Sequence, residues 1–358
     1  QAQRMAGVSL ESGYVAAGVG RSEQMMASCS IVPLGAQVTA QDLARLDAAG
    51  RAFAERDEQV VVHLERLQTS VDGTPALASP VGQLCSQLNA DFLILTGDRV
   101  TARNILHIVG SNSLAVSRLA PSALATALAV TDPHERDTGV TVVDCGGGTT
   151  TLVMFAHGHV VGMSTIPVGG NHLTFDIARQ LQVPLNEAER IKLECGRVGT
   201  AHSVDAKAHD ASVADVTSVL ISQATRALIR QILTSRASSL LRTVAERLER
   251  FQTASAVCAL SGQQVVLAGG ASRLKGFDGL ARELLGRSVR CGRVYGCPDF
   301  PEVVQEMPFA AALGLLTLVP KPVVVSAQVS SMLEVGTLHT GAITSRHVAS
   351  APRFSVGY

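Results

Sequence analysis

The 358-residue sequence predicts an α/β fold with two lobes. Chains of this length normally divide into two or more domains, each with its own core. Runs of β-branched residues alternate with segments whose apolar residues recur at helical spacing. A glycine-rich turn at residues 144–150 separates two of the β-branched runs. Its composition gives the first indication of function.

This turn has the composition of a phosphate-binding hairpin. The strand expected at residues 140–143 ends in Asp144, after which come glycines 146–148 and threonines 149–151. Glycines allow successive N–H groups to turn toward one anion, and the carboxylate can hold hydrated Mg²⁺. Walker-A and Rossmann loops run into a helix, whereas here a β-run follows at residues 152–155. The alternative is a tight β-hairpin that binds no ligand.

Composition excludes several other classes of protein. Thirty basic residues balance thirty acidic ones, and aromatic residues are scarce, so no nucleic-acid partner is indicated. The seven cysteines form no C-x-x-C pair, which argues against a zinc site or a disulfide framework and favours a reducing cytoplasm. The longest apolar stretch, at residues 307–320, is too short to span a bilayer.

The region before the hairpin predicts a compact α+β subdomain inserted into a larger fold. A helix is expected at residues 40–54 with Thr39 as its N-cap, followed by strands at 59–67 and 92–96. The alternative is that this region continues the main fold. A third strand of the hairpin's meander is expected at residues 159–166. Further helices are expected at residues 100–109, 120–130, 173–181, 187–194 and 216–251.

A second glycine motif follows the strand expected at residues 264–268. Gly269 and Gly270 form the turn, and we expect a helix to begin at Ser272 or Arg273. A glycine pair between a strand and a helix lets a ring or a phosphate lie against the backbone near the helix N-terminus. The same pair is also common in ordinary α/β crossovers.

Four motifs together resemble the FtsA family of bacterial division proteins. They are Val142-Val143-Asp144-Cys145-Gly146-Gly147-Gly148-Thr149-Thr150, the run from Ile166-Pro167-Val168-Gly169-Gly170-Asn171 to Ala178, Ala188-Glu189-Arg190-Ile191-Lys192, and the run from Val266 to Leu274. Their order and spacing match over roughly residues 1–318. The resemblance implies an actin-like (ribonuclease H-like) two-lobed fold with the inserted 1C subdomain of that family, an SHS2 domain.

The resemblance also implies where the subdomains lie. We expect a partial subdomain 1A at residues 1–29 and 99–134, subdomain 1C at 30–98, subdomain 2A at 135–176 and 257–320, subdomain 2B at 177–256, and a tail at 321–358.

The nucleotide site implied by the resemblance binds ATP with Mg²⁺ between the lobes. Asp144 would reach Mg²⁺ through water. The other implied contacts are Gly146, Gly147, Gly148, Thr149 and Thr150 for the β- and γ-phosphates, Glu189 and Lys192 for ribose and adenine, and Gly269, Gly270 and Ser272 for adenosine. Two alternatives remain: Asn186-x-x-Glu189 has capping-box spacing, so Glu189 could cap its own helix, and Lys192 could be a surface residue.

The implied function is to link the FtsZ ring to the cytoplasmic face of the inner membrane at the division septum. The implied partners are the FtsZ C-terminal peptide on subdomain 2B, further copies of the chain in filaments, and other divisome proteins. No residue stands out as a catalytic base, so at most slow ATPase activity is expected. The alternatives are a PilM-like pilus assembly protein, a small-molecule kinase of the same fold, and a scaffold that has lost its nucleotide.

Two features depart from the family pattern. The chain begins at Gln1 without the family's N-terminal Asp-Gly-Ser/Thr hairpin, which predicts a fragment or a processed form with weaker nucleotide affinity. Each missing charge-assisted hydrogen bond is worth about 1.5–3 kcal/mol. Residues 337–358 show no apolar stripe at helical spacing, so peripheral membrane attachment rests on the resemblance alone.

Overall fold

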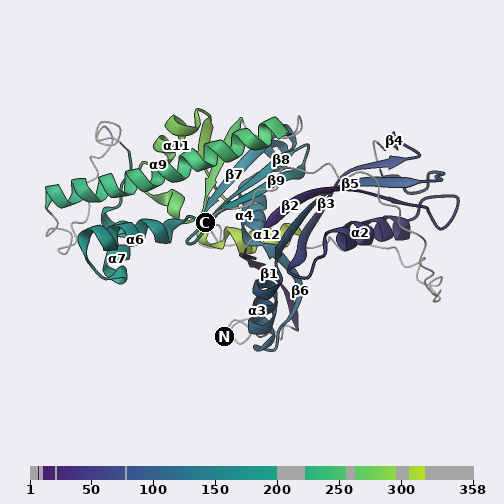
Figure 1. The fold of residues 1–358 in the computed structure, drawn as a ribbon, viewed down its shortest axis with the longest axis horizontal. Coiled ribbons are helices and arrows are strands. Elements are labelled where there is room, and N and C mark those ends of the chain that lie inside the picture. The colour runs from purple at the N-terminus through teal and green to yellow at the C-terminus, as the bar shows by residue number, and fades with distance from the viewer. Residues whose placement is uncertain are drawn as a thin grey trace. The chain divides into compact units, whose positions relative to one another are not determined.

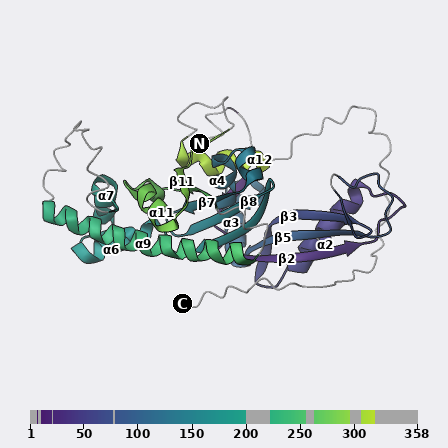
Figure 2. The same ribbon diagram turned by 90° about the horizontal axis from the view of Figure 1, so that it is seen from above.

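The computed structural model describes residues 7, 11–20, 22–76, 79–199, 222–254, 263–295 and 306–318. The chain forms two compact units, one of Gln1–Pro121 with Leu315–Tyr358 and one of Ser122–Gly314. Figures 1 and 2 show their elements coloured along the chain. The tail expected at 321–358 and the helix start expected at 216–221 lie outside the described residues.

The first unit contains a four-stranded antiparallel sheet in the order β2-β5-β3-β4. Its strands are β2 (Glu23–Ile31), β3 (Gln59–Val71), β4 (Thr74–Pro75) and β5 (Leu88–Asp98). β3 and β5 are longer than expected, because they pair along their whole length, from Gln59 opposite Asp98 to Val71 opposite Leu88.

Helix α2 (Ala40–Ala54) covers one face of this sheet (Figures 1 and 2), with Leu46 in the same buried cluster as Phe92 and Ile94 of β5. The predicted N-cap is confirmed: Thr39 Oγ1 accepts the N–H of Asp42, and the Asp42 carboxylate accepts the N–H of Thr39. This reciprocal capping box fixes the start of the helix.

A second, smaller sheet in the same unit pairs β1 (Ser12–Ala17) with β6 (Ala115–Pro121) in parallel. Helix α3 (Arg99–Gly110) connects β5 to β6, and the Asp98 carboxylate caps it by accepting the N–H of Thr101 at 2.6 Å.

The second unit is built on a five-stranded sheet in the order β11-β10-β7-β8-β9. Strands β7 (Val140–Cys145), β8 (Thr150–Ala156) and β9 (His159–Ile166) form the predicted antiparallel meander. Strands β10 (Gln264–Ala268) and β11 (Ser288–Cys291) extend the sheet in parallel beyond β7. The glycine-rich turn therefore joins two strands, as predicted.

Helices flank this sheet. They are α4 (Ser122–Val130), α5 (Pro133–Thr138), α6 (Gly170–Leu181), α7 (Leu185–Cys195), α9 (Gln223–Ala254) and α11 (Phe277–Leu285). The last helix of the described residues, α12 (Ala310–Leu318), contains the boundary between the two units. α9 is the long helix that passes α6 and α11 (Figure 1). Arg236 of α9 joins it to α6 through a two-point ion pair with Asp176. No helix in the described ranges carries an apolar stretch suited to crossing a bilayer.

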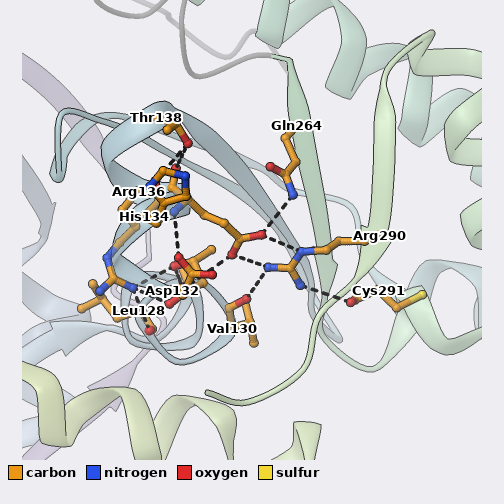
Figure 3. A network of polar contacts seen from close by, with 12 residues as sticks. Leu128, Val130, Asp132, His134, Arg136, Thr138, Gln264, Arg290 and Cys291 are labelled. Carbon is orange, nitrogen blue, oxygen red and sulfur yellow. Dashed lines mark hydrogen bonds and ion pairs between the residues drawn. The ribbon is translucent and has the colours of Figure 1, made fainter. Parts of the chain in front are cut away.

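An ion pair between Glu135 of α5 and Arg290 of β11 ties the α4–α5 connection to the sheet (Figure 3). Arg290 Nη2 and Nε donate to the two carboxylate oxygens at 2.6 and 2.9 Å, and Gln264 Nε2 donates to the same carboxylate at 3.0 Å. Arg290 Nη2 also donates to the carbonyl of Val130. The pair is largely shielded from water, since the two side chains are 14% and 26% exposed.

Candidate functional site

The glycine-rich turn presents a short row of unused backbone donors. Gly146 N–H donates to the carbonyl of Thr149 at 2.9 Å and closes the turn. Gly147, Gly148 and Thr149 are exposed, and their N–H groups have no main-chain partner in the part of the chain that the structure describes. Consecutive free amides at an exposed turn are the kind of donor set that binds an anion.

The first residues of α6 are hydrogen-bonded to the carbonyl groups of this turn. Gly170 N–H donates to the carbonyl of Gly146 at 2.9 Å, and Asn171 N–H donates to that of Gly147 at 2.8 Å. A Cβ on Gly169 would lie 2.6 Å from the Gly146 oxygen, so only glycine allows the two segments to approach this closely. The turn and the first residues of α6 are therefore held as one unit.

Two of the residues expected to contact phosphate are already hydrogen-bonded within the protein. The N–H of Gly146 is engaged in closing the turn, and the hydroxyl of buried Thr150 donates to the carbonyl of Val168 at 2.8 Å. A tight turn needs its closing hydrogen bond, and Thr150 is the first residue of a fully buried strand. The N–H of Gly146 and the hydroxyl of Thr150 are therefore engaged within the protein, and the turn's free main-chain donors in the described residues are those of Gly147, Gly148 and Thr149. The expected phosphate contacts of Gly146 and Thr150 stay predictions.

Asp144 is the penultimate residue of β7, one residue before the strand ends at the turn. Desolvation by burial raises the pKa of its carboxyl group to about 6, although a hydrogen bond from Thr126 of α4 acts in the opposite direction. No Lys, Arg or His of the described ranges forms an ion pair with it. A mostly buried carboxylate without a protein cation is a suitable oxygen ligand for Mg²⁺ or its water shell, so the residues present fit this ion.

The second glycine motif lies beside Asp144. β10 runs parallel to β7 with Ala268 opposite Asp144, and the chain then turns at Gly269, whose φ is +80°. A Cβ on Gly269 would lie 2.5 Å from Asp144 Oδ1, so the backbone reaches the carboxylate only because the residue is glycine. Two motifs far apart in sequence thus meet at one edge of the sheet.

The segment after Gly269 differs from expectation. No α-helix begins at Ser272 or Arg273: Ala271–Arg273 form one 3₁₀ turn, and α11 starts at Phe277 after Gly276, which has φ of +86°. Buried Ser272 donates its hydroxyl to the carbonyl of Gly269 at 2.8 Å. Its side chain therefore closes the turn, and the glycine pair does not lie at the N-terminus of an α-helix.

Glu189 and Lys192 form an ion pair on α7, with Lys192 Nζ 2.7 Å from Glu189 Oε2. Lys192 is buried, so the surface alternative is wrong. The capping alternative for Glu189 is also wrong, because α7 begins at Leu185 and Glu189 lies beyond its first turn. Partial burial pushes the pKa of Glu189 upward, but hydrogen bonds from Lys192 and Thr174 outweigh it, so the pKa lies below its usual range.

The segments that carry the expected site residues lie close together around Gly170. A Cβ on Gly170 would lie 3.3 Å from the Cβ of Ala271 and 3.8 Å from Lys192 Nζ. The start of α6, the α7 ion pair and the turn after β10 are thus neighbours within the second unit. Sequence reasoning missed the supporting roles of Thr126, Asn171 and Thr174, although the Gly169-Gly170 pair was a visible signal of close backbone approach.

Comparison with known proteins agrees with these observations. Residues 141–314 match the family model of the cell division protein FtsA, and residues 21–96 match the SHS2 domain inserted in FtsA. Cell division protein FtsA of Rhizobium meliloti (strain 1021) is 30% identical over 324 residues, which cover 88% of this chain and 71% of that protein. FtsA of Escherichia coli (strain K12) is 28% identical over 320 residues, covering 88% and 76%.

Among solved structures, a PilM-PilN type IV pilus biogenesis complex matches with a TM-score of 0.53 at 19% identity, over 82% of this chain and 76% of that one. At this level of identity the likeness concerns the fold alone.

Proposed function

Because the chain belongs to the FtsA family of cell division proteins and has the actin-like fold with the inserted SHS2 domain, we propose that its second unit binds ATP with Mg²⁺. The observation that carries this proposal is the row of three free amides, Gly147 to Thr149, next to the half-buried, desolvated carboxylate of Asp144. Neither feature helps a plain hairpin, because exposed glycines cost folding entropy and a buried anion costs desolvation energy.

In the proposed site the amides of the turn bind the phosphates, and Asp144 orients the water shell of Mg²⁺. The bound ion neutralises phosphate charge. Gly269 and Gly270 give adenosine a backbone surface without side chains, and Glu189 accepts a hydrogen bond from a ribose hydroxyl. Gly146, Thr150 and Ser272 hold the two turns in shape through their own hydrogen bonds.

We further propose that nucleotide binding sets the conformation of the protein and its assembly at the septum, with slow hydrolysis at most. In this role the protein links the FtsZ ring to the cytoplasmic face of the inner membrane, as a peripheral component of the divisome. Family membership is the support for this part of the proposal.

Two surfaces suit the proposed partners. Large apolar side chains are exposed on α7 and α9, at Leu185, Leu193 and Leu228, and favour the region of residues 177–256 as the site for the FtsZ C-terminal peptide. Phe175 of α6, two residues before this region, is exposed as well. In the inserted domain, two loops joined by hydrogen bonds between Val38 and Gly82 and between Val38 and Gln83 expose Val32, Leu34, Val81 and Leu84. Exposed apolar groups of this kind favour self-association into filaments.

Thermal unfolding with and without Mg²⁺–ATP tests nucleotide binding. A ligand at one hundred times its Kd stabilises the folded state by about 2.7 kcal/mol, and an unchanged unfolding temperature at millimolar Mg²⁺–ATP would contradict the proposal. Binding of the FtsZ C-terminal peptide, measured by fluorescence anisotropy, tests the division role. Phosphate transfer to small hydroxylated or carboxylated compounds would instead support a kinase of the same fold.

A further inference from the structure

We propose that Lys192 is a positioning residue that couples the phosphate-binding turn to the ribose-binding carboxylate, and that it does not itself touch the nucleotide. This inference rests on the nucleotide site proposed above, but it assigns Lys192 a different task from the ribose and adenine contact that the family resemblance implies.

The hydrogen bonds of Lys192 are the first argument. Its side chain is only 10% exposed, and Nζ lies 3.2 Å from the carbonyl oxygen of Gly170, 2.9 Å from Thr174 Oγ1 and 2.7 Å from Glu189 Oε2. An ammonium group has three N–H donors, so these acceptors use all of them. Contact with a ligand would require the loss of one charge-assisted hydrogen bond in a nearly dry location.

One of these acceptors leads directly to the phosphate-binding turn. Gly170 receives the Lys192 hydrogen bond on its carbonyl, and its own N–H donates to the carbonyl of Gly146 at 2.9 Å. A single residue therefore separates Lys192 from the turn. Lys192 thus fixes the position of Gly170, the first residue of α6, and Gly170 in turn fixes the turn that carries the free amides.

The other two acceptors set the orientation of Glu189. Lys192 Nζ and Thr174 Oγ1 both donate to Oε2 of this carboxylate, while Oε1 has no protein partner within the described ranges. The Glu189 side chain is 42% exposed, so Oε1 is accessible from solvent. A carboxylate oxygen fixed in this way can accept a hydrogen bond from a vicinal hydroxyl such as the ribose 2′-OH.

The consequence is that discrimination between ribose and deoxyribose depends on a residue that contacts neither. Without Lys192, the Glu189 carboxylate is held only by Thr174 and loses its fixed orientation. The preference for a 2′-OH should then fall more than the affinity for the shared parts of the nucleotide. A direct phosphate or adenine contact would instead weaken ATP and 2′-deoxy-ATP by the same factor. A direct contact of Lys192 with the 2′-OH would still lower the preference when Lys192→Met is added to Glu189→Ala, whereas a positioning role predicts no further change in that background.

The test measures Kd for Mg²⁺–ATP and Mg²⁺–2′-deoxy-ATP by isothermal titration calorimetry on the full chain, as wild type, Lys192→Met, Thr174→Val and Arg190→Gln. Arg190 is the matched control, because it is on the same helix in an exposed ion pair with Glu187. We expect wild type and Arg190→Gln to prefer ATP, Lys192→Met to reduce the preference at least fivefold, and Thr174→Val to reduce it by a smaller factor.

Equal losses for the two nucleotides in Lys192→Met, or a wild type that binds both equally well, would overturn the inference while leaving the nucleotide site in place. If the wild type binds neither nucleotide, the proposed function fails as well. Circular dichroism establishes that each variant is folded, and Thr174→Val, which keeps the shape of the side chain, decides the question if Lys192→Met does not fold.

Discussion

The backbone of Gly269 lies directly against the carboxylate of Asp144. Asp144 is the penultimate residue of β7, and Gly269 directly follows the parallel neighbour β10. The close approach of the Gly269 backbone, with φ of +80°, leaves no room for a side chain beside Oδ1. This contact brings the two glycine-rich motifs into one site.

Gly269→Ala tests that contact. The added Cβ would clash with Oδ1 of Asp144 in a conformation that L-residues rarely adopt, so we expect a loss of about 1–3 kcal/mol in stability together with weaker Mg²⁺–ATP binding. Urea unfolding and calorimetry provide the measurements. Gly279→Ala is the control: it lies inside α11 with open space around it, and alanine there should leave stability unchanged or raise it by up to about 1 kcal/mol. Equal behaviour of the two variants would contradict the role of Gly269.

Asp144→Asn should separate stability from ligand binding. Burial raises the pKa of the Asp144 carboxyl to about 6, so carrying the anion at neutral pH costs the ligand-free protein up to about 3 kcal/mol. Asparagine can still accept the hydrogen bond from Thr126. We therefore expect a higher unfolding temperature without ligand and no further rise when Mg²⁺–ATP is added. A variant that is still stabilised by Mg²⁺–ATP as the wild type is would show that Asp144 does not serve the cation.

Asp42→Asn tests the pH dependence of the inserted domain. Burial pushes the pKa of the Asp42 carboxyl upward, but hydrogen bonds from Thr39, Leu34 and Arg45 outweigh it and hold the pKa below its usual range. The folded state thus binds the proton more weakly than the unfolded state, so this group stabilises the fold above about pH 4 and ceases to do so as the pH falls through the lowered value.

We expect Asp42→Asn to lose about 1–2 kcal/mol near pH 7 and to approach wild type at low pH. Urea unfolding at pH 7 and pH 3 gives the comparison. Asp47→Asn on the same helix, whose partly exposed carboxylate pairs with Arg66, should lose less than about 1 kcal/mol. A pH-independent difference for Asp42→Asn would show that its charge does not matter.

Glu135→Gln should weaken the connection between α5 and β11. The change removes the charge that Arg290 contacts at two points, in a place only 14% exposed, and we expect a loss of about 1–3 kcal/mol by urea unfolding. The exposed Glu187 carboxylate, paired with Arg190, provides the control, since Glu187→Gln should cost less than about 1 kcal/mol. A double variant with Arg290→Met that is no worse than Glu135→Gln alone would confirm that the two side chains act as a pair.

The sequence predicted those elements whose determinants are local. Thr39 and Asp42 lie three residues apart and form their capping box without help from the rest of the chain. The meander around residues 144–150 followed from β-branched runs on either side of glycines, and the structure has it at that place. The helix expected at Ser272 failed for a reason that is also local, because Gly276 takes a left-handed conformation and delays the start of α11.

The amino-acid sequence by itself therefore determined where strands, helices and glycine turns form, because periodicity and backbone freedom are properties of short segments. Only the tertiary structure decided which groups of the turn remain free to bind a ligand. The hydroxyl of Thr150 is engaged by the carbonyl of Val168, 18 residues away, which folding brings against it, whereas the N–H of Gly146 is satisfied within the turn by Thr149. Among the described residues no main-chain carbonyl folds against the N–H groups of Gly147, Gly148 and Thr149. Lys192, which the sequence left either at the nucleotide or on the surface, follows the same rule, because the three acceptors of its ammonium group come from α6 and α7.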